Sequence, residues 1–367
     1  MSKLDTPTDL ACFSRAFRLH RLLLDELGVR QVAAVVGGSL GGMFVLEWAY
    51  FGKDYVRCIV PIATSSRHSA WGISWGEAQR QSIYADPKYD DGYYPFSDPP
   101  STGLGAARMA ALLTYRSRNS FEARFGRNIP DPSRRQTIRE RPTPATPSEA
   151  HFHIHNDGHR WSRESLSRRT SNDAAKNPSR TDATRSPEPE AADPQFHGPQ
   201  SGGSLTGGEV MPTGSTYFSA QSYLRYQGSK FVKRFDSNCY IAMTRKLDTH
   251  DVSRGRAQSI AEALGMIEQP VLVLGIESDG LFTFAEQEEL AEHIKDARLE
   301  RIDSPEGHDA FLLQFEQVNR YILAFLREVL PDIMSKDTGG ELAESSVGQL
   351  TKSSTFGEAE IEDITAW

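Results

Sequence analysis

The chain has 367 residues, a formal net charge of −8, and 38% hydrophobic and 25% charged positions. The negative charge argues against a general nucleic-acid binder, and no apolar run approaches the roughly 18 residues that span a bilayer. Three cysteines, none of them in a CxxC pair, cannot form a disulfide framework and favour a reducing compartment. We therefore expect a cytoplasmic protein that binds neither nucleic acid nor membrane.

The first part of the chain has ordered patterning. Apolar side chains recur at helical spacing from Phe17 to Leu27, and Gly28 is a natural stop. The valine-rich run Gln31–Val36 predicts a buried strand, Met43–Tyr50 a helix and Tyr55–Ala63 a second buried strand. This succession of strand, helix and strand indicates a parallel βαβ unit and an α/β fold.

The composition changes in the middle of the chain. Trp71–Phe125 is helical in pieces, interrupted by the turn-rich stretch Asp86–Gly103. From about Asn128 to Gly214, few aliphatic residues remain, so this segment cannot bury enough apolar surface to offset its ordering entropy. We expect a disordered insertion there. It contains four closely spaced histidines without fixed geometry, so no metal site is predicted. They are His151, His153, His155 and His159.

Ordered patterning returns in the third part of the chain. Helical spacing resumes over Tyr217–Ala242, and the apolar run Val271–Gly275 predicts a third strand. Arg298–Ile302 predicts a fourth strand, and Phe311–Val329 predicts an amphipathic closing helix. The acidic tail from Ser335 onward is expected to be loose.

Gly37, Ser39 and Gly41 form a GxSxG pattern between a predicted strand and a predicted helix. In a nucleophile elbow the serine sits on a strained turn, and glycines two positions before and after it avoid a clash. The backbone N–H of Leu40 would then donate to a developing oxyanion. A plain strand-to-helix turn is the alternative, but the flanking elements favour the elbow. A phosphate-binding loop is disfavoured because no Gly-Lys-Ser/Thr follows.

An elbow serine requires a base and an acid, in the chain order serine, acid, histidine. Asp279 follows the predicted third strand and His308 follows the fourth, at the sheet edge where sites form. Glu277 is a competing acid, and His308 could instead be a surface or capping histidine of the last helix. The order after the elbow favours a triad of Ser39, Asp279 and His308.

Seven blocks of sequence occur in the order of one known family. They are GGSLGGMFVLEWA (37–49), SSRHSAW (65–71), EAQRQSIYADPKY (77–89), GLGAARMAALLTYRS (103–117), FEARFGR (121–127), SYLRYQGSKFVKRFDSNCYIAMTRKLDTHDVSRGR (222–256) and SPEGHDAFLLQ (304–314). Across about residues 17–130 and 217–330, the chain resembles fungal homoserine O-acetyltransferases of the α/β-hydrolase superfamily. Deacetylcephalosporin-C acetyltransferase and fungal serine O-acetyltransferases share much of this pattern.

The resemblance implies an α/β-hydrolase fold with a helical lid, and an activity. Acetyl-CoA, a co-substrate rather than a bound cofactor, would acetylate Ser39, and the hydroxyl of L-homoserine would take the acetyl group, a step of methionine biosynthesis. In one alternative the acceptor is serine or a specialised metabolite. In a second alternative the acceptor is water, which would make the protein a hydrolase. Another alternative is a truncated, inactive family member that serves as an interaction module.

The resemblance also implies residues that hold the substrate. Arg108 and Tyr115 match positions that contact homoserine, and Asp309 matches the acid that holds its ammonium group. An arginine suits a carboxylate because it can bind it with two hydrogen bonds. Without the resemblance, Arg108 would be a helix-surface arginine and Asp309 an acid at a helix N-terminus. A homodimer through the lid helices is implied as well.

Only 38 residues precede Ser39, which leaves room for one helix and one strand. In the family that the chain resembles, several strands and a loop that gives a second oxyanion N–H precede the elbow. The resemblance therefore implies that the sheet lacks its N-terminal strands, that the elbow strand has an open edge, and that one of two oxyanion donors is missing, which typically costs about 100- to 1000-fold in rate. The expected segments are a partial α/β-hydrolase core (1–66), a helical lid (67–130), the disordered insertion (131–214), the continued lid (215–267), the C-terminal part of the core (268–332) and a flexible acidic tail (333–367).

Overall fold

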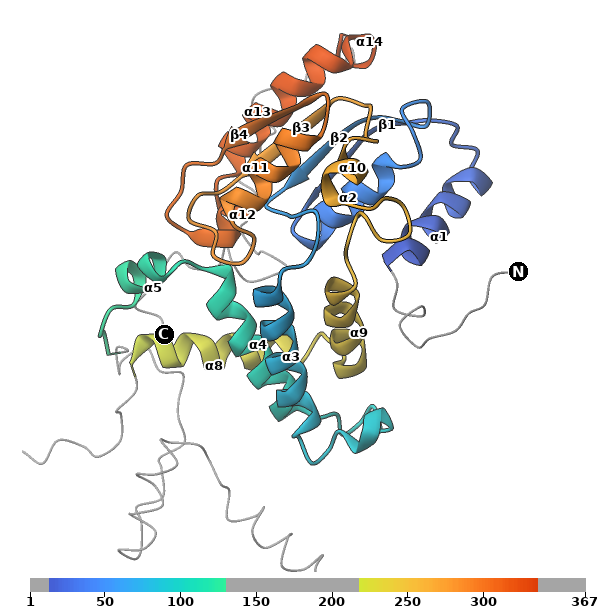
Figure 1. Cartoon of the computed structure of the whole chain (residues 1–367). Helices are drawn as coiled ribbons and strands as arrows, with labels where there is room; N and C mark the ends of the chain where they lie inside the picture. Colours follow the sequence, from blue (N-terminus) through green and yellow to red (C-terminus); the bar gives the residue numbers. More distant parts are fainter. Residues whose placement is uncertain (1–12, 130–217, 336–367) are drawn as a thin grey trace, which may run out of the picture. The chain divides into compact units, whose positions relative to one another are not determined.

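The computed structural model describes residues 13–129 and 218–335 (Figure 1). The predicted disordered insertion at 131–214, with its four histidines, and nearly all of the predicted loose tail lie outside the described residues. No helix within these two ranges is long and apolar enough to cross a membrane.

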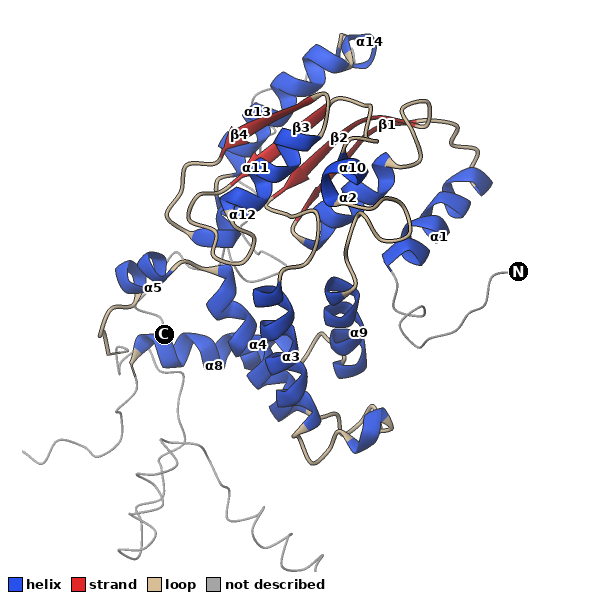
Figure 2. Cartoon of the chain, viewed as in Figure 1, coloured by secondary structure: helices blue, strands red, loops and turns tan. Residues whose placement is uncertain are grey.

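Four parallel strands form one sheet in the order β1-β2-β3-β4 (Figure 2). The register pairs β1 with β2 from Val32↔Val56 to Gly38↔Ile62. Each predicted strand is present to within two residues, and β1 continues through both glycines up to the serine. The strands are β1 Val32–Gly38, β2 Val56–Ile62, β3 Val271–Gly275 and β4 Ala297–Arg301.

Helices cover both faces of this sheet, which a parallel sheet needs because its strands are apolar on both sides. Ile59, Val271 and Val273 face a core shared with α1, α2, α10 and α11. Cys58, Leu272 and Leu274 face a second core shared with α12 and α13. The helices are α1 Phe13–Glu26, α2 Leu40–Ala49, α10 Ile260–Leu264, α11 Phe284–His293, α12 Ala310–Leu313, α13 Phe315–Val329 and α14 Pro331–Met334.

A separate set of helices, called the lid here, contains no strand among its described residues. Its core joins Ile83, Leu104 and Ala107 to Phe231 and Tyr240, so segments on both sides of the predicted insertion pack together. The lid elements are α3 Ala70–Tyr84, the short 3₁₀ turn Asp90–Gly92, α4 Ser101–Tyr115, α5 Arg118–Arg124, α8 Ser219–Phe231 and α9 Ser237–Asp248.

The structure differs from the predicted helices in four places. The helical patterning predicted over Tyr217–Ala242 corresponds to two helices, because Asp236 caps a new helix by accepting a hydrogen bond from the Cys239 N–H. Helix α4 already begins at Ser101, within the predicted turn-rich stretch. The predicted closing helix is divided at Gln314 into α12 and α13. Helices α10 and α11 were not predicted, although α11 begins with a capping box between Thr283 and Glu286.

Strand β1 lies at one end of the sheet. Within the described ranges it is hydrogen-bonded to β2 alone, and the Val36 side chain on it is 45% exposed. Helix α1 also presents several exposed leucines, Leu19, Leu22, Leu23 and Leu27.

Candidate active site

The turn between β1 and α2 holds Ser39 in a strained conformation, with φ 57° and ψ −124°. A Cβ at Gly37 would lie 2.6 Å from the carbonyl oxygen of Gly41, so residue 37 must be glycine for the turn to close this tightly. The expectation of a similar need at residue 41 is wrong, since a Cβ there would meet nothing within 4 Å.

Ser39, His308 and Asp279 are joined by hydrogen bonds. Nε2 of His308 lies 2.9 Å from Oγ of Ser39, and Nδ1 lies 2.7 Å from Oδ2 of Asp279. A carboxylate only accepts hydrogen bonds, so Nδ1 carries the proton and Nε2 is left to accept from the serine hydroxyl. The other Asp279 oxygen accepts from the N–H groups of Leu281 and Phe282 at 2.8 and 3.0 Å, which fixes the carboxylate.

The competing assignments have other partners. Glu277 is exposed and pairs with Arg301 at 2.6 Å, away from His308. His308 is 4% exposed, so it is not a surface histidine. Two other buried histidines are neutral at pH 7, because burial lowers the pKa of His68 to about 4 and that of His250 to about 3. They are therefore poor candidates for a general base.

The charged groups around His308 raise its pKa. Burial lowers the pKa of His308, but the adjacent Asp279 carboxylate, its hydrogen bond and the nearby Asp309 charge outweigh burial, so the pKa lies above its ordinary value. The imidazole ring is enclosed by the rings of Tyr115, Phe282 and Phe311, with centroids 6.3, 5.3 and 5.6 Å away. These contacts restrict the orientation of the ring.

Leu40 is the first residue of α2 and directly follows Ser39. The N–H groups of the first helical turn have no acceptor within their own helix and sit at the positive end of its dipole. The Leu40 N–H is thus chemically suited to receive negative charge that develops beside Ser39. Thr64 steadies the same turn by donating from Oγ1 to the Ser39 carbonyl at 2.8 Å.

Arg108 and Tyr115 lie on α4. Arg108 contacts the Tyr115 ring, and Tyr115 contacts the ring of His308. Arg108 is 6% exposed, so the alternative of a helix-surface arginine is wrong. Its guanidinium lies 5.2 Å from the Tyr115 ring centroid and 4.8 Å from that of Phe231. Because Tyr115 in turn contacts the His308 ring, a positive charge is held one aromatic ring away from the triad.

Asp309 follows His308 and is 4% exposed. Its Oδ2 lies 3.0 Å from Nε of Arg116, a side chain that is itself 3% exposed and also pairs with Glu306. Our sequence reasoning missed Arg116 and Glu306, although both lie within matched blocks, beside Tyr115 and His308. Their positions could have identified them, because Arg116 directly follows Tyr115 and Glu306 lies two residues before His308.

Glu306 is the centre of this ion pairing. It also accepts from Ser120 Oγ at 2.5 Å, and Arg124 lies 3.6 Å away. Burial raises the pKa of Glu306, but the hydrogen bond from Ser120 and the charges of Arg116 and Arg124 lower it below its ordinary value. We call Arg116, Ser120, Arg124, Glu306 and Asp309 the Arg116 cluster. It joins the lid to the loop 304–309, called here the histidine loop.

The histidine loop also makes close backbone contacts. Gly307 has φ +78°, and a Cβ there would lie 2.4 Å from the backbone nitrogen of Ser117. On its other side, the Gly307 N–H donates to Ser278 Oγ at 3.0 Å, and Ser278 donates to the Ser304 carbonyl at 2.7 Å. The loop that carries His308 is thus fixed between the lid and the loop that carries Asp279.

Comparison with known proteins agrees with this architecture. A family model described as alpha/beta hydrolase fold matches residues 12–176. A homoserine O-acetyltransferase of Emericella nidulans is 65% identical over 357 residues, which cover 95% of this chain and 71% of that protein. One of Schizosaccharomyces pombe is 53% identical, with 98% and 73% covered.

The chain belongs to the homoserine O-acetyltransferase family. This is a family of acyltransferases, and the chain is an enzyme of that class. The solved structure of homoserine O-acetyltransferase from Bacillus anthracis superposes with a TM-score of 0.59 at 16% identity, covering 86% of this chain and 65% of that one. The acetyl esterase MekB gives 0.53 at 20% identity, covering 85% and 66%. At these identities both comparisons support the α/β-hydrolase fold alone.

Proposed function

We propose that this chain transfers the acetyl group of acetyl-CoA to the hydroxyl of L-homoserine through an acetyl-Ser39 intermediate. The single observation that carries the proposal is the hydrogen-bonded line Ser39–His308–Asp279 in a chain of this family. A nucleophile, a base and an orienting acid in this geometry perform acyl transfer by covalent catalysis.

In the first half-reaction, Ser39 Oγ attacks the thioester carbonyl carbon while His308 Nε2 takes the hydroxyl proton. The oxyanion that forms accepts a hydrogen bond from the Leu40 N–H. The carbon–sulfur bond then breaks, and the leaving thiolate takes the proton from His308. The products are acetyl-Ser39 and free CoA. Asp279 stays ionised and stabilises the imidazolium form of His308 in between.

In the second half-reaction, the homoserine hydroxyl oxygen attacks the acetyl-Ser39 carbonyl carbon and gives its proton to His308 Nε2. The bond from that carbon to Ser39 Oγ breaks, and Ser39 Oγ recovers the proton. One base therefore serves both half-reactions. The Asp279 carboxylate, which raises the pKa of His308, stabilises the imidazolium that forms in each half-reaction.

The acceptor is recognised in this proposal by opposite charges. Arg108 pairs with the homoserine carboxylate, Tyr115 lies between that carboxylate and His308, and Asp309 holds the ammonium group. The buried position of Arg108 supports this role, since a buried guanidinium gains most from a carboxylate partner. Arg116 would then hold the Asp309 carboxylate in place while it receives the substrate.

The test measures acetyl-CoA consumption by the purified chain with homoserine, with serine and without an acceptor. We expect CoA release to depend on homoserine, with O-acetylhomoserine as the product. CoA release at an equal rate without an acceptor would show that the chain is a hydrolase. Faster CoA release with serine than with homoserine would show that serine is the acceptor. A chain that folds cooperatively but forms no acetyl-enzyme would be a non-catalytic family member.

We also propose a homodimer through the lid helices and a cytoplasmic location. The side chains of Tyr93 and Phe96, in the lid segment between α3 and α4, are 86% and 94% exposed and offer apolar area for an interface. Cys58 and Cys239 are free thiols, as a reducing compartment favours. Sedimentation of the wild type beside Phe96→Asp tests the dimer, and a fluorescent fusion tests the location.

A further inference from the structure

Two adjacent glycines end strand β1, and successive positions of a strand face opposite sides of the sheet. A Cβ at Gly37 would meet the Gly41 backbone in α2, whereas a Cβ at Gly38 would meet the side chain of Phe311 in α12. The tight serine turn requires the first glycine. It does not require the second, which occupies a variable position of the GxSxG pattern. Gly38 therefore needs an explanation of its own.

The ring of Phe311 lies directly against the backbone of Gly38. A Cβ added at Gly38 would lie 2.5 Å from Cε2, 2.8 Å from Cζ and 3.0 Å from Cδ2 of this ring. Carbon atoms in favourable contact are about 3.5–4.0 Å apart. The ring cannot retreat freely, because Phe311 also packs against the core between the sheet and α13. This contact therefore admits only glycine at residue 38.

Phe311 also contacts the catalytic base. It comes three residues after His308, a separation that places two side chains on the same face of a helical stretch. The 3₁₀ helix Gly307–Asp309 is followed directly by α12, so both residues lie in such a stretch. The two rings meet nearly edge to face, with centroids 5.6 Å apart and planes at 71°. One side chain thus contacts both the backbone before the nucleophile and the ring of the base.

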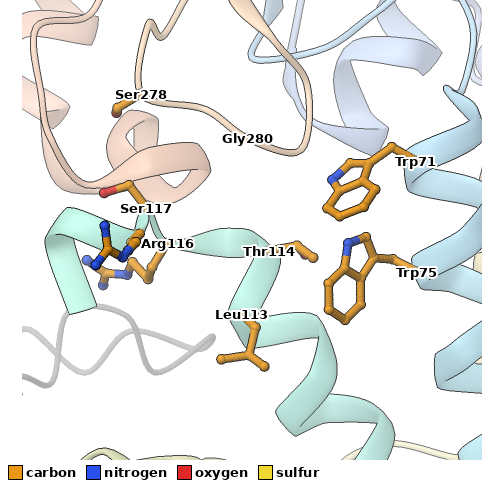
Figure 3. A pocket seen from close by; sticks show the side chains of 9 residues that line it. Trp71, Trp75, Leu113, Thr114, Arg116, Ser117, Ser278 and Gly280 are labelled. Atoms are coloured by element: carbon orange, nitrogen blue, oxygen red, sulfur yellow. The ribbon is translucent and has the colours of Figure 1, made fainter. Parts of the chain in front are cut away.

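Phe311 lies outside the pocket that adjoins the histidine loop (Figure 3). This pocket of about 250 Å³ is lined by lid residues, among them Trp71 and Trp75, and by Gly280. Neither Phe311 nor Gly38 belongs to its lining. A molecule in this pocket would not rest on the Phe311 ring, which points to an effect of Phe311 through the groups that it touches.

The hydrogen bond between Ser39 and His308 is available during only part of the proposed reaction. In the free enzyme, Ser39 Oγ lies 2.9 Å from Nε2 and donates to it. In the acetyl-enzyme, Oγ carries the acetyl group and has no proton to donate. The imidazole must nevertheless stay in place to take the proton of the acceptor. At that stage its position depends on Asp279 and on the aromatic rings around it.

We propose that Phe311 is a positioning residue that sets the separation between His308 and the serine turn, and that residue 38 is glycine to make room for this ring. The ring holds the imidazole beside the elbow while Ser39 carries the acetyl group. The inference rests on the proposed function in one respect, since it takes Ser39 as the nucleophile and His308 as the base. It does not depend on the identity of the acyl donor or the acceptor.

The first test changes both partners of the contact and uses p-nitrophenyl acetate, an activated acetyl ester. Gly38→Ala displaces the Phe311 ring and with it His308, so kcat should fall by about 100-fold, the cost of a displacement near 1 Å. Phe311→Leu removes Cε2 and Cζ, and alone should lower kcat by about twofold to tenfold, the loss of one aromatic contact. The double variant Gly38→Ala/Phe311→Leu should recover kcat to about tenfold above that of Gly38→Ala.

Leu312→Ala is the matched control for this exchange. Leu312 follows Phe311 in α12, and its side chain is 42% exposed. Combined with Gly38→Ala, it should restore no activity. Thermal unfolding of each variant shows whether it is folded at the assay temperature. A double variant no more active than Gly38→Ala, or an equal recovery with Leu312→Ala, would overturn the positioning role of Phe311.

The second test uses Phe311→Leu alone, so it does not require Gly38→Ala to fold. Stopped-flow release of p-nitrophenol measures formation of acetyl-Ser39, and intact mass spectrometry after removal of the ester measures its loss. We expect loss of the acetyl group to slow by about twofold to tenfold and formation to slow less, because the serine hydrogen bond is absent only in the acetyl-enzyme. Equal slowing of both steps, or a larger effect on formation, would contradict the inference.

The same ester separates this inference from the proposed function, because its reaction involves neither CoA nor homoserine. Wild-type protein and variants that follow the expected pattern with the ester, but make no O-acetylhomoserine from acetyl-CoA and homoserine, would overturn the proposed function and leave the role of Phe311 in place. Normal formation of O-acetylhomoserine by the wild type, without recovery in the double variant, would overturn the role of Phe311 alone.

Discussion

The two loops that meet at the site are held by different kinds of contact. The turn that carries Ser39 is shaped by its own neighbours, through the closeness of Gly37 to Gly41 and the left-handed backbone of the serine. The loop that carries His308 is held by polar partners far away in sequence, such as Arg116 at a separation of 190 residues from Glu306. The geometry of the nucleophile therefore depends on its own turn and on the end of the neighbouring strand at Thr64, whereas that of the base depends on the lid.

Different physical interactions therefore fix the two loops. Steric exclusion fixes the serine turn, which needs no charged side chain for its shape. The histidine loop instead combines ion pairs, hydrogen bonds and a close backbone approach at Gly307. Substitutions in the lid should thus disturb the base and leave the nucleophile turn intact. Substitutions at Ser39, Gly37, Arg116 and Asp309 test this separation.

Replacement of the nucleophile gives the largest effect. Ser39→Ala should abolish the acetyl-enzyme and lower kcat by on the order of a million-fold, as loss of a triad nucleophile does elsewhere. A pulse of radiolabelled acetyl-CoA followed by peptide mapping measures the label on Ser39. His308→Ala should also remove labelling, because the hydroxyl then lacks its base. Label that persists at another residue in Ser39→Ala would refute the assignment.

The turn itself is tested by a pair of glycine substitutions. Gly37→Ala forces a methyl group to 2.6 Å from a backbone oxygen, so the serine must move and kcat should fall by about 100-fold, the cost of a displacement near 1 Å. Gly41→Ala is the matched control, since its methyl group meets nothing within 4 Å. Steady-state kinetics with p-nitrophenyl acetate compares the two. Equal losses in both variants would mean that the turn is not shaped by this contact.

The Arg116 cluster connects the lid to the loop that carries His308. Arg116→Ala leaves the buried Asp309 and the partly buried Glu306 without their main counter-charge, so it should lower the free energy of unfolding by about 3–5 kcal/mol. At a temperature where it stays folded, its kcat should fall with acetyl-CoA and with p-nitrophenyl acetate, because both reactions need His308 in place. Arg116→Lys should recover part of both losses. Unfolding in urea and parallel kinetics provide the measurements, and wild-type kcat in Arg116→Ala would contradict the role.

The smallest effect concerns pH. Acyl transfer needs neutral His308, so activity should be lost as pH falls through its raised pKa. The ionisable groups around the ring are Asp279, Asp309 with its partner Arg116, and Tyr115. Asp309→Asn removes one charge that raises the pKa, and should move the acidic limb of kcat/KM to lower pH.

p-Nitrophenyl acetate is the substrate for this pH profile, because it has no ammonium group for Asp309 to bind. Asp303→Asn, an exposed acid just before the histidine loop, is the matched control. An acidic limb that stays in place or moves to higher pH in Asp309→Asn would show that Asp309 does not act on His308 through its charge.

The features that could be predicted from the sequence depend on residues close together in the chain, and those that could not depend on distant residues. The strands, the elbow and the order of Ser39, Asp279 and His308 were predictable, because each depends on residues a few positions apart. Arg116 was not identified, because its importance comes from Glu306 and Asp309, which lie far along the chain. The division of the helical stretch before α9 was not predicted, although the side chain of Asp236 is a typical helix cap.

The backbone of Ser39 has a consequence for heat resistance. A non-glycine residue at φ 57° costs about 1–3 kcal/mol, which the rest of the fold must offset. Ser39→Ala and Ser39→Gly both lack the hydroxyl, but only glycine adopts this conformation without strain. The glycine variant should therefore melt at a higher temperature than the alanine variant. The catalytic serine at this turn therefore lowers the melting temperature of the active protein.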